Sequence, residues 1–283
     1  IILFKINLMK IFYWSPFLSN IATVDSVTNS INSLKRYSNQ NKYETFIIDS
    51  TGEWQEKLEK ISGIDIVKLY SKSYYKFLPK GNFLKSRISQ ILIFVLNFNL
   101  LRKLLIREKP DFLIAHLIIS LPLMLFFFFK FDTKLIIRIS GTPKLNKFRR
   151  FFWALFSKNV HAVTCPTLST LNKLDELKIF PKKKLKLLND PILKVNLINI
   201  KKKEKIDNKF IGANYILSIG RLTEQKNFVL LIKAFHEIFK VYPNLKLIIL
   251  GEGEEKRKIE KLIEELNLKD HVFLEGYKKN IFN

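Results

Sequence analysis

Cysteine, glycine and acidic residues are all scarce in this sequence. Cys165 is the single cysteine, which excludes an internal disulfide framework and favours a reducing compartment such as the cytoplasm. Only 9 glycines occur in 283 residues, so the position of each one is informative. Asp and Glu number 25 against 49 Lys and Arg, a formal net charge of +24. Such a field concentrates anions, whether nucleic acid, anionic lipid or small phosphorylated ligands.

The sequence also has little that resembles a membrane span. The longest apolar run, residues 112–129, reaches the length that can cross a bilayer. We interpret it as a short strand, Phe112–Ala115, followed by a buried helix over residues 117–129, because His116 and Ser120 are poorly suited to hydrocarbon. An integral membrane protein remains the alternative interpretation of this run.

Short apolar runs alternate with helical patterns from residue 9 to about residue 200. This alternation is typical of a parallel sheet with crossover helices. Helices are predicted after a possible cap at Asp25, where Val27 and Ile31 recur at helical spacing, and over Arg87–Ile106. Strands are predicted at Lys10–Trp14, Thr45–Ile48, Asp65–Leu69, Phe112–Ala115, Leu135–Ile139, Ala162–Cys165 and Leu185–Leu188.

A lysine-rich stretch then separates this region from a second alternating pattern. We predict an α/β protein with a first Rossmann-like domain at 9–200, a linker at 201–214 and a partial second domain at 215–283. Residues 1–8 are interpreted as upstream translation, because Met9 reads as a natural start. In the second domain we expect strands at Tyr215–Ile219, Leu245–Leu250 and Val272–Leu274, and helices at 227–241 and 254–266.

Each predicted strand of the second domain ends in glycine. Gly220 follows the first strand, Gly251 and Gly253 the second, and Gly276 the third. Ligands of open parallel sheets bind at this edge, where helix N-termini favour anions. Arg221 and Lys226 lie in the first of these loops and could bind a diphosphate. The Gly251-Glu252-Gly253 segment is only half of a dinucleotide fingerprint, so NAD binding is poorly supported.

The second domain contains three further motifs, which are ILSIGRL with QKNF (216–228), YPNLKLIILGEG (242–253) and VFLEGY (272–277). In order and at similar spacing, these segments resemble the donor domain of glycosyltransferase family 4, among the group 1 glycosyltransferases. The first domain is similar to the family's acceptor domain more loosely, through 109–116, 138–141, 163–167 and 188–191. It departs from the family in residues 15–23, which lack paired glycines, and at Ser140, where many members have histidine.

The resemblance implies a GT-B fold, two Rossmann-like domains with a nucleotide-sugar donor held in the cleft. It further implies retention of configuration, with no cofactor and no required metal. By this resemblance, Gly220, Arg221 and Lys226 would bind the donor diphosphate, and the positive charges of Arg221 and Lys226 would stabilise the leaving group. Gly251, Gly253 and Gly276 would contact the nucleotide. His116 is a candidate catalytic residue, and Ser140 and Gly141 are candidate acceptor-side residues.

The implied activity is sugar transfer from a nucleoside-diphosphate sugar to a saccharide or lipid-linked acceptor in cell-surface polysaccharide synthesis. We expect the protein to lie in the cytoplasm, peripheral at the inner face of the cell membrane, since its basic surface and apolar helices suit an anionic leaflet. The family's paired donor-sugar glutamates lie beyond the third strand, so the chain is expected to be truncated and inactive alone. Alternatives are a nucleotide-sugar epimerase of the same fold, or a basic nucleic-acid- or membrane-binding protein. Against nucleic acid, no clustered basic stripe with interleaved aromatics is found.

Overall fold

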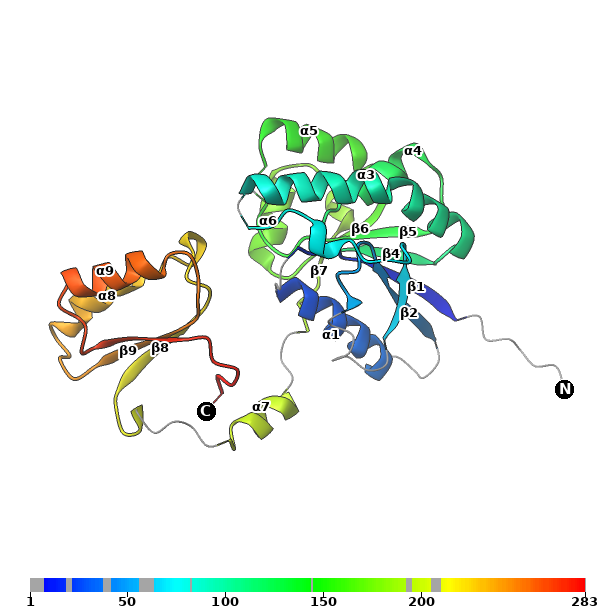
Figure 1. The fold of residues 1–283 in the computed structure, drawn as a ribbon. Coiled ribbons are helices and arrows are strands. Elements are labelled where there is room, and N and C mark those ends of the chain that lie inside the picture. Colours follow the sequence, from blue (N-terminus) through cyan, green and yellow to red (C-terminus); the bar gives the residue numbers. More distant parts are fainter. Residues whose placement is uncertain are drawn as a thin grey trace. The chain divides into compact units, whose positions relative to one another are not determined.

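The chain folds into two compact units in a computed structural model that describes residues 8–18, 22–37, 42–55, 64–81, 83–143, 145–191, 195–204 and 210–282. Unit 1 comprises Ile1–Ile192 and unit 2 comprises Leu193–Asn283. The division falls earlier than the predicted linker at 201–214. A short helix, α7 (Val195–Lys201), occupies the end of the segment that we assigned to the first domain. Figure 1 shows the elements of each unit, which are described separately below.

Unit 1 is built on a parallel sheet of seven strands in the order β3-β2-β1-β4-β5-β6-β7. Every strand predicted for this region is present, with ends that differ by one or two residues. The strands are β1 (Met9–Trp14), β2 (Tyr43–Asp49), β3 (Asp65–Lys68), β4 (Phe112–Ala115), β5 (Lys134–Arg138), β6 (Val160–Cys165) and β7 (Leu185–Leu187).

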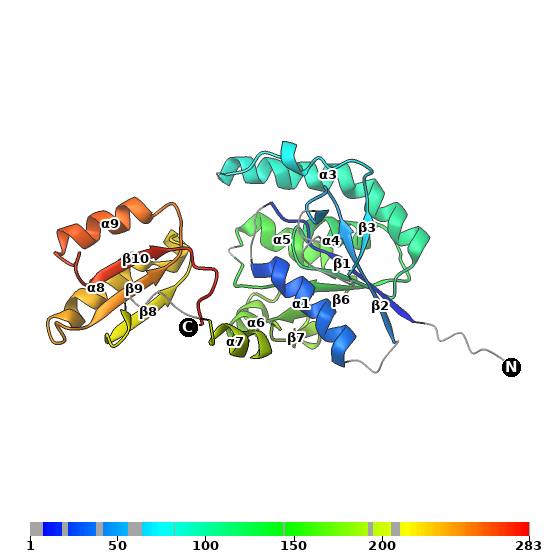
Figure 2. The same cartoon turned by 60° about the horizontal axis from the view of Figure 1, so that its bottom comes forward.

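Helices cover both faces of this sheet (Figures 1 and 2). The described helices of unit 1 longer than one turn are α1 (Ala22–Tyr37), α3 (Phe83–Glu108), α4 (Ser120–Phe128), α5 (Lys147–Phe156) and α6 (Leu168–Glu176). Asp25 was predicted as the cap of the first helix, but it lies inside the first turn of α1. A carboxylate there still interacts favourably with the positive end of the helix dipole.

The central strand β1 contributes to two separate cores. Ile11 and Tyr13 pack with Val27 and Ile31 of α1 on one face. Phe12 and Trp14 belong to the core on the other face, together with apolar residues of α3 and α4. Successive side chains of a strand point to opposite faces, so a strand covered on both sides must be apolar throughout. This explains why β1 reads as a continuous apolar run.

The order of the strands reverses between β1 and β4. The first three strands extend the sheet in one direction, and β4 to β7 extend it in the other. Trp14 at the end of β1 is paired with Ala115 at the end of β4. The loops that follow these two strands leave toward opposite faces, and ligands of doubly wound sheets bind in the crevice between such loops.

The apolar run at 112–129 forms strand β4 and helix α4, as predicted, with Pro122 near the start of the helix. Within the described part of the chain, the helix that is long and apolar enough to cross a membrane is instead residues 84–108 of α3. Only 33% of its most apolar window is buried. Its inward residues Ile93, Leu101 and Leu105 belong to the core of unit 1, so one side of α3 is packed on the sheet.

Unit 2 contains a parallel sheet of three strands in the order β10-β9-β8. Its strands are β8 (Tyr215–Ile219), β9 (Lys246–Leu250) and β10 (Val272–Gly276), joined by α8 (Phe228–Phe239) and α9 (Lys256–Glu265). Phe228, Phe235 and Ile232 of α8 are buried against Ile259 and Ile263 of α9. Ile238 of the same helix is 39% exposed.

Gly251 is held close to the backbone of the neighbouring strand end. Its φ of +149° is one that side chains rarely adopt, and a Cβ there would lie 1.8 Å from the carbonyl oxygen of Gly220. A Cβ on Gly220 would instead meet the Phe228 ring at an ordinary 3.5 Å. The close approach of the two loops therefore requires glycine at position 251 in particular.

We predict that Gly251→Ala lowers the unfolding free energy of unit 2 by at least about 1 to 3 kcal/mol, the typical cost of a strained backbone conformation. Gly220→Ala, made in the same unit, should change it by less than about 0.5 kcal/mol. Urea unfolding followed by circular dichroism measures both. Equal midpoints for the two variants would contradict the assigned role of Gly251.

Candidate functional site

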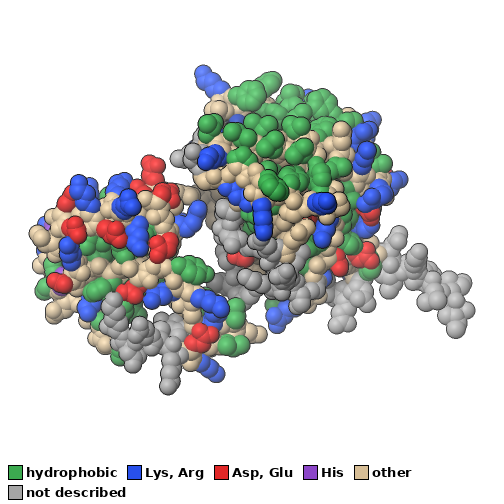
Figure 3. All heavy atoms as spheres, in the orientation of Figure 1, with side chains coloured by type: hydrophobic (Ala, Val, Ile, Leu, Met, Phe, Trp, Pro, Cys, Tyr) green, Lys and Arg blue, Asp and Glu red, His purple; other side chains and the backbone are tan. Residues whose placement is uncertain are grey.

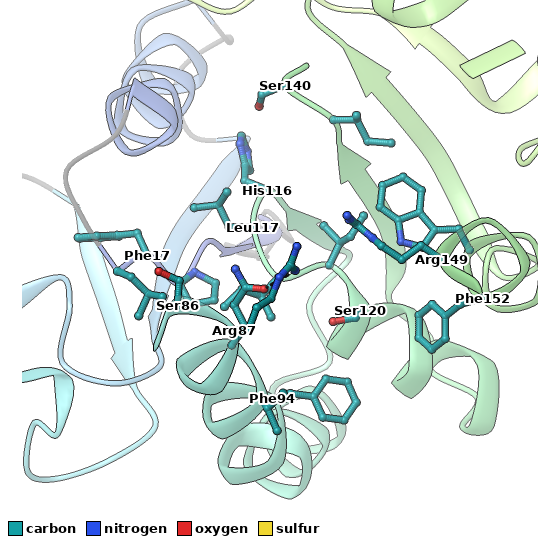
Figure 4. Close-up of a pocket in the computed structure, with 18 of the residues that line it drawn as sticks. Phe17, Ser86, Arg87, Phe94, His116, Leu117, Ser120, Ser140, Arg149 and Phe152 are labelled. Carbon is teal, nitrogen blue, oxygen red and sulfur yellow. Dashed lines mark hydrogen bonds between the residues drawn. The ribbon is translucent and has the colours of Figure 1, made fainter. Parts of the chain in front are cut away.

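A cavity of about 880 Å³ opens in unit 1 at the switch point between β1 and β4. Its inner wall is made by the residues that follow β1, β4 and β5, and its outer wall by α3 and α5 (Figure 4). Its polar and charged lining includes His116, Arg138, Ser140, Arg87 and Arg149. This is the position at which a doubly wound sheet is expected to bind its ligand.

Arg138, at the end of β5, forms a buried ion pair at the base of the cavity. Its guanidinium donates to the Asp190 carboxylate and to the carbonyl oxygen of Leu188, both in the loop after β7. The side chain of Arg138 is only 4% exposed and that of Asp190 is 15% exposed. The pair therefore ties the end of β5 to the segment that leaves β7. The sequence predicts no role for either residue, since nothing in their spacing shows that they meet.

We predict that Arg138→Met lowers the unfolding free energy of unit 1 by up to about 3 to 5 kcal/mol, because it leaves the partly buried Asp190 carboxylate without its charge partner. Arg107→Met removes an exposed partner of Glu108 and should cost at most about 1 kcal/mol. The double variant Arg138→Met/Asp190→Leu should recover much of the loss. Thermal unfolding measures all three, and equal losses for Arg138→Met and Arg107→Met would show that the buried pair is not structural.

His116, the predicted catalytic residue, directly follows β4 and lines the cavity. Its backbone N–H donates to the carbonyl of Trp14 over 2.9 Å, which fixes the residue at the switch point. Burial, reinforced by the charge of Arg138, lowers the pKa of the imidazole to about 3. At neutral pH the ring is therefore uncharged, and its Nδ1 is buried without a hydrogen-bond partner among the described residues.

We predict that His116 makes unit 1 less stable in acid. The pKa is about 3 in the folded chain against an ordinary 6.5, so the unfolded state takes up a proton that the folded state does not. The contribution is constant above about pH 6.5 and is lost progressively as the pH falls toward about 3. Unfolding free energies of wild type and His116→Gln, measured across this window, should diverge. Parallel curves would contradict a depressed histidine pKa.

The outer wall of the cavity brings in residues that the sequence did not single out. Arg87 of α3 and Arg149 of α5 both line it, and burial, together with the charge of Arg87, lowers the pKa of Arg149. The two labelled side chains extend from their helices toward the same space in Figure 4. The predicted acceptor-side residue Ser140 also lines the cavity, whereas Gly141 is exposed and is not among its lining residues. Neither arginine was predictable, because basic residues occur throughout the sequence.

A second buried carboxyl organises the loop after β2 and lies outside the cavity lining. Glu53 accepts hydrogen bonds from the backbone N–H and hydroxyl groups of Ser50 and Thr51. Burial, with Asp49 beside it, raises the pKa of Glu53 to about 8. Because its oxygens are occupied within its own loop, we assign Glu53 to the local structure of unit 1.

The glycine-terminated strand ends of unit 2 lie side by side, as the sequence predicts. The Gly220 N–H donates to the carbonyl of Leu250, and the Gly251 N–H donates to that of Gly276. The Leu222 N–H donates to the carbonyl of Glu252, which links the first two loops. A Cβ on Gly253 would lie 2.2 Å from the carbonyl oxygen of Leu222, at the same contact between the loops. Four of the predicted donor-site residues thus share one sheet edge.

Arg221 and Lys226 are exposed at this same edge. Lys226 is the last residue of a single 3-10 turn, and its side chain passes over Gly220. Asn227, with a left-handed φ of 51°, then caps α8 by accepting from the Leu230 N–H. Two cations therefore stand beside the N-terminus of a helix of twelve residues, an arrangement that favours an anionic group.

No cluster of three or more metal-ligating side chains occurs among the described residues. His161 is exposed, while His236 lies beside Glu237 and His271 packs against the Phe239 ring. These positions are typical of surface and structural histidines.

Residues 199–281 match the family model described as glycosyl transferases, group 1. An uncharacterized glycosyltransferase of Methanocaldococcus jannaschii is 29% identical over 252 residues, which are 76% of this chain and 61% of the relative. A Campylobacter jejuni enzyme, named as an N-acetylgalactosaminyltransferase acting on a diphospho-undecaprenol-linked saccharide, is 33% identical over 157 residues, covering 52% of this chain and 41% of its own. The chain thus spans about three fifths or less of these relatives' lengths.

Solved structures share the fold at low sequence identity. Anabaena HepE in complex with UDP and glucose superposes with a TM-score of 0.63 at 13% identity, over 96% of this chain and 70% of that one. UDP-GlcNAc 2-epimerase from Neisseria meningitidis gives a TM-score of 0.60 at 16% identity, over 96% and 73%. The predicted GT-B fold and the resemblance to group 1 glycosyltransferases are confirmed. Placement in family 4 itself stays a prediction.

Proposed function

We propose that this chain is the acceptor-side domain and part of the donor domain of a retaining glycosyltransferase. The enzyme transfers a sugar from a nucleoside-diphosphate sugar to a saccharide or lipid-linked acceptor in cell-surface polysaccharide synthesis. The family match in residues 199–281 and the relatives' names support this class of reaction. The observation on which the proposal rests is the loop edge of unit 2, where Arg221 and Lys226 flank glycines at a helix N-terminus.

The donor diphosphate binds at this edge. The backbone N–H groups at the start of α8 and the two cations neutralise the charge that develops on the leaving diphosphate as the sugar bond breaks. A Cβ at Gly251 would meet the Gly220 carbonyl and a Cβ at Gly276 would meet the Glu252 carboxylate, so these glycines let the loops of this edge lie close together beside the bound nucleotide. This arrangement supplies the leaving-group stabilisation from side chains and backbone, and requires no cofactor and no metal.

The acceptor binds in the cavity of unit 1. Its inner wall offers the Ser140 hydroxyl and the uncharged His116 imidazole as hydrogen-bond partners for sugar hydroxyls. A pKa near 3 makes His116 unsuited to donate a proton as an imidazolium at neutral pH, so its role is to position a hydroxyl. The remaining walls are largely apolar, which suits an acceptor that carries a lipid.

A nucleotide-sugar epimerase is the second candidate, because a UDP-GlcNAc 2-epimerase shares the fold over 96% of this chain. An epimerase releases an altered sugar nucleotide and needs no acceptor, and it makes no use of a separate apolar cavity. Product analysis by mass spectrometry and NMR, with and without a lipid-linked acceptor, separates the two activities in the enzyme.

We predict that Arg221→Ala weakens binding of a nucleoside diphosphate by roughly tenfold to a hundredfold, the loss expected for one charge-assisted contact of about 1.5 to 3 kcal/mol. Isothermal calorimetry with UDP, GDP and ADP in turn measures it, since the base is not assigned. Arg257→Ala, an exposed arginine of α9 in the same unit, is the matched control and should change nothing. Equal affinity for wild type and Arg221→Ala would show that Arg221 does not bind the diphosphate.

A further inference from the structure

The outward side of α3 is apolar along its first half. Leu84, Ile88, Ile91 and Val95 recur at helical spacing and are 68%, 43%, 63% and 64% exposed. The opposite side of the same helix is packed into the core of unit 1. A helix of a soluble protein normally turns its polar side to water, so an outward apolar stripe of this length indicates a partner.

Phenylalanines of the two neighbouring helices extend this stripe into a surface. Phe148 and Phe151 of α5 are 74% and 65% exposed, and Phe128 of α4 is 57% exposed. Figure 3 shows apolar side chains gathered over this part of unit 1. We call the outward sides of α3, α4 and α5 the apolar face. Aromatic rings at its border resemble the aromatic residues that proteins place at the level of lipid head groups.

The charges on these helices are almost all positive. Within α3, α4 and α5 the single acidic residue is Glu108, at the far end of α3 from the apolar stripe. The basic residues of α3 and α5 are Lys85, Arg87, Arg102, Lys103, Arg107, Lys147, Arg149 and Arg150. An apolar stripe within a basic surface is complementary to a bilayer with anionic head groups. A protein partner would not require this one-sided charge.

The cavity of unit 1 borders the same face. Ile91 and Arg87 of α3, and Phe148 and Arg149 of α5, are lining residues of the cavity as well as parts of these two helices. Exposed apolar residues of the face and the outer wall of the cavity are therefore contributed by the same elements. A molecule held by an apolar tail at this face would have its polar end beside the two arginines.

We propose that the apolar face docks on the surface of an anionic lipid bilayer, with α3 lying along the lipid, and that the cavity receives its acceptor directly from that surface. Docking on the bilayer is inferred from the geometry of α3 to α5 alone. The receipt of the acceptor by the cavity rests on the proposed function. Arg87 and Arg149 then meet the phosphate of a lipid-linked acceptor, and His116 lies buried at the switch point of the same cavity.

The test is co-sedimentation of the purified chain with vesicles, without any sugar nucleotide, so that its outcome does not depend on transferase activity. The chain should bind vesicles of phosphatidylcholine and phosphatidylglycerol, and bind pure phosphatidylcholine roughly tenfold less. Ile91→Glu/Val95→Glu should lower the partition coefficient roughly tenfold or more. Both positions are exposed, so circular dichroism should be unchanged.

Val241→Glu/Tyr242→Glu is the matched control. It adds the same charge at positions of unit 2 that are 69% and 63% exposed, and it should bind vesicles like wild type. Equal loss in both variants, or no loss in either, overturns the proposal. So does retention of the bound chain after alkaline carbonate, which would make α3 a true span. Self-association abolished by Ile91→Glu/Val95→Glu, without vesicle binding, would assign the face to a second copy instead.

Discussion

Burial of both faces of β1 is the constraint from which the rest of unit 1 follows. Phe12 and Trp14 serve one core, and Ile11 and Tyr13 serve the other. A strand buried on both sides must have neighbours on both edges and helices on both faces, which a doubly wound sheet provides. The switch in strand order beside β1 then opens the crevice in which the cavity lies. The position of the cavity thus follows from the packing of helices on both faces of β1.

Helix α3 is apolar both on the side that faces the core and on the side that faces solvent. Its inward side covers the sheet, while its outward side is exposed among basic residues. The same helix supplies part of the cavity wall. Covering the sheet, shaping the cavity and presenting a lipid-compatible surface therefore depend on one element, and a change at one of its faces can be tested apart from the others.

The local patterns predicted a large part of this structure. Strands of both units were expected within a residue or two, because a buried parallel strand is a short apolar run bounded by polar or turn residues. The edge formed by Gly220, Gly251 and Gly276 was also expected, since parallel strands end at one side of a sheet. The resemblance to group 1 glycosyltransferases added the class of ligand for that edge. These features depend on residues close together in the sequence.

Only the tertiary structure decided which distant residues meet. Arg138 and Asp190 form their ion pair across the ends of β5 and β7, and no spacing in the sequence indicates such a contact. Arg87 and Arg149 come together because α3 and α5 flank the same cavity, and His116 loses its proton affinity through burial beside Arg138. The sequence by itself determined the elements and the glycine edge of unit 2, because these follow from local periodicity. Ion pairing, burial and exposure arise from packing between distant segments, and the folded chain alone determines them.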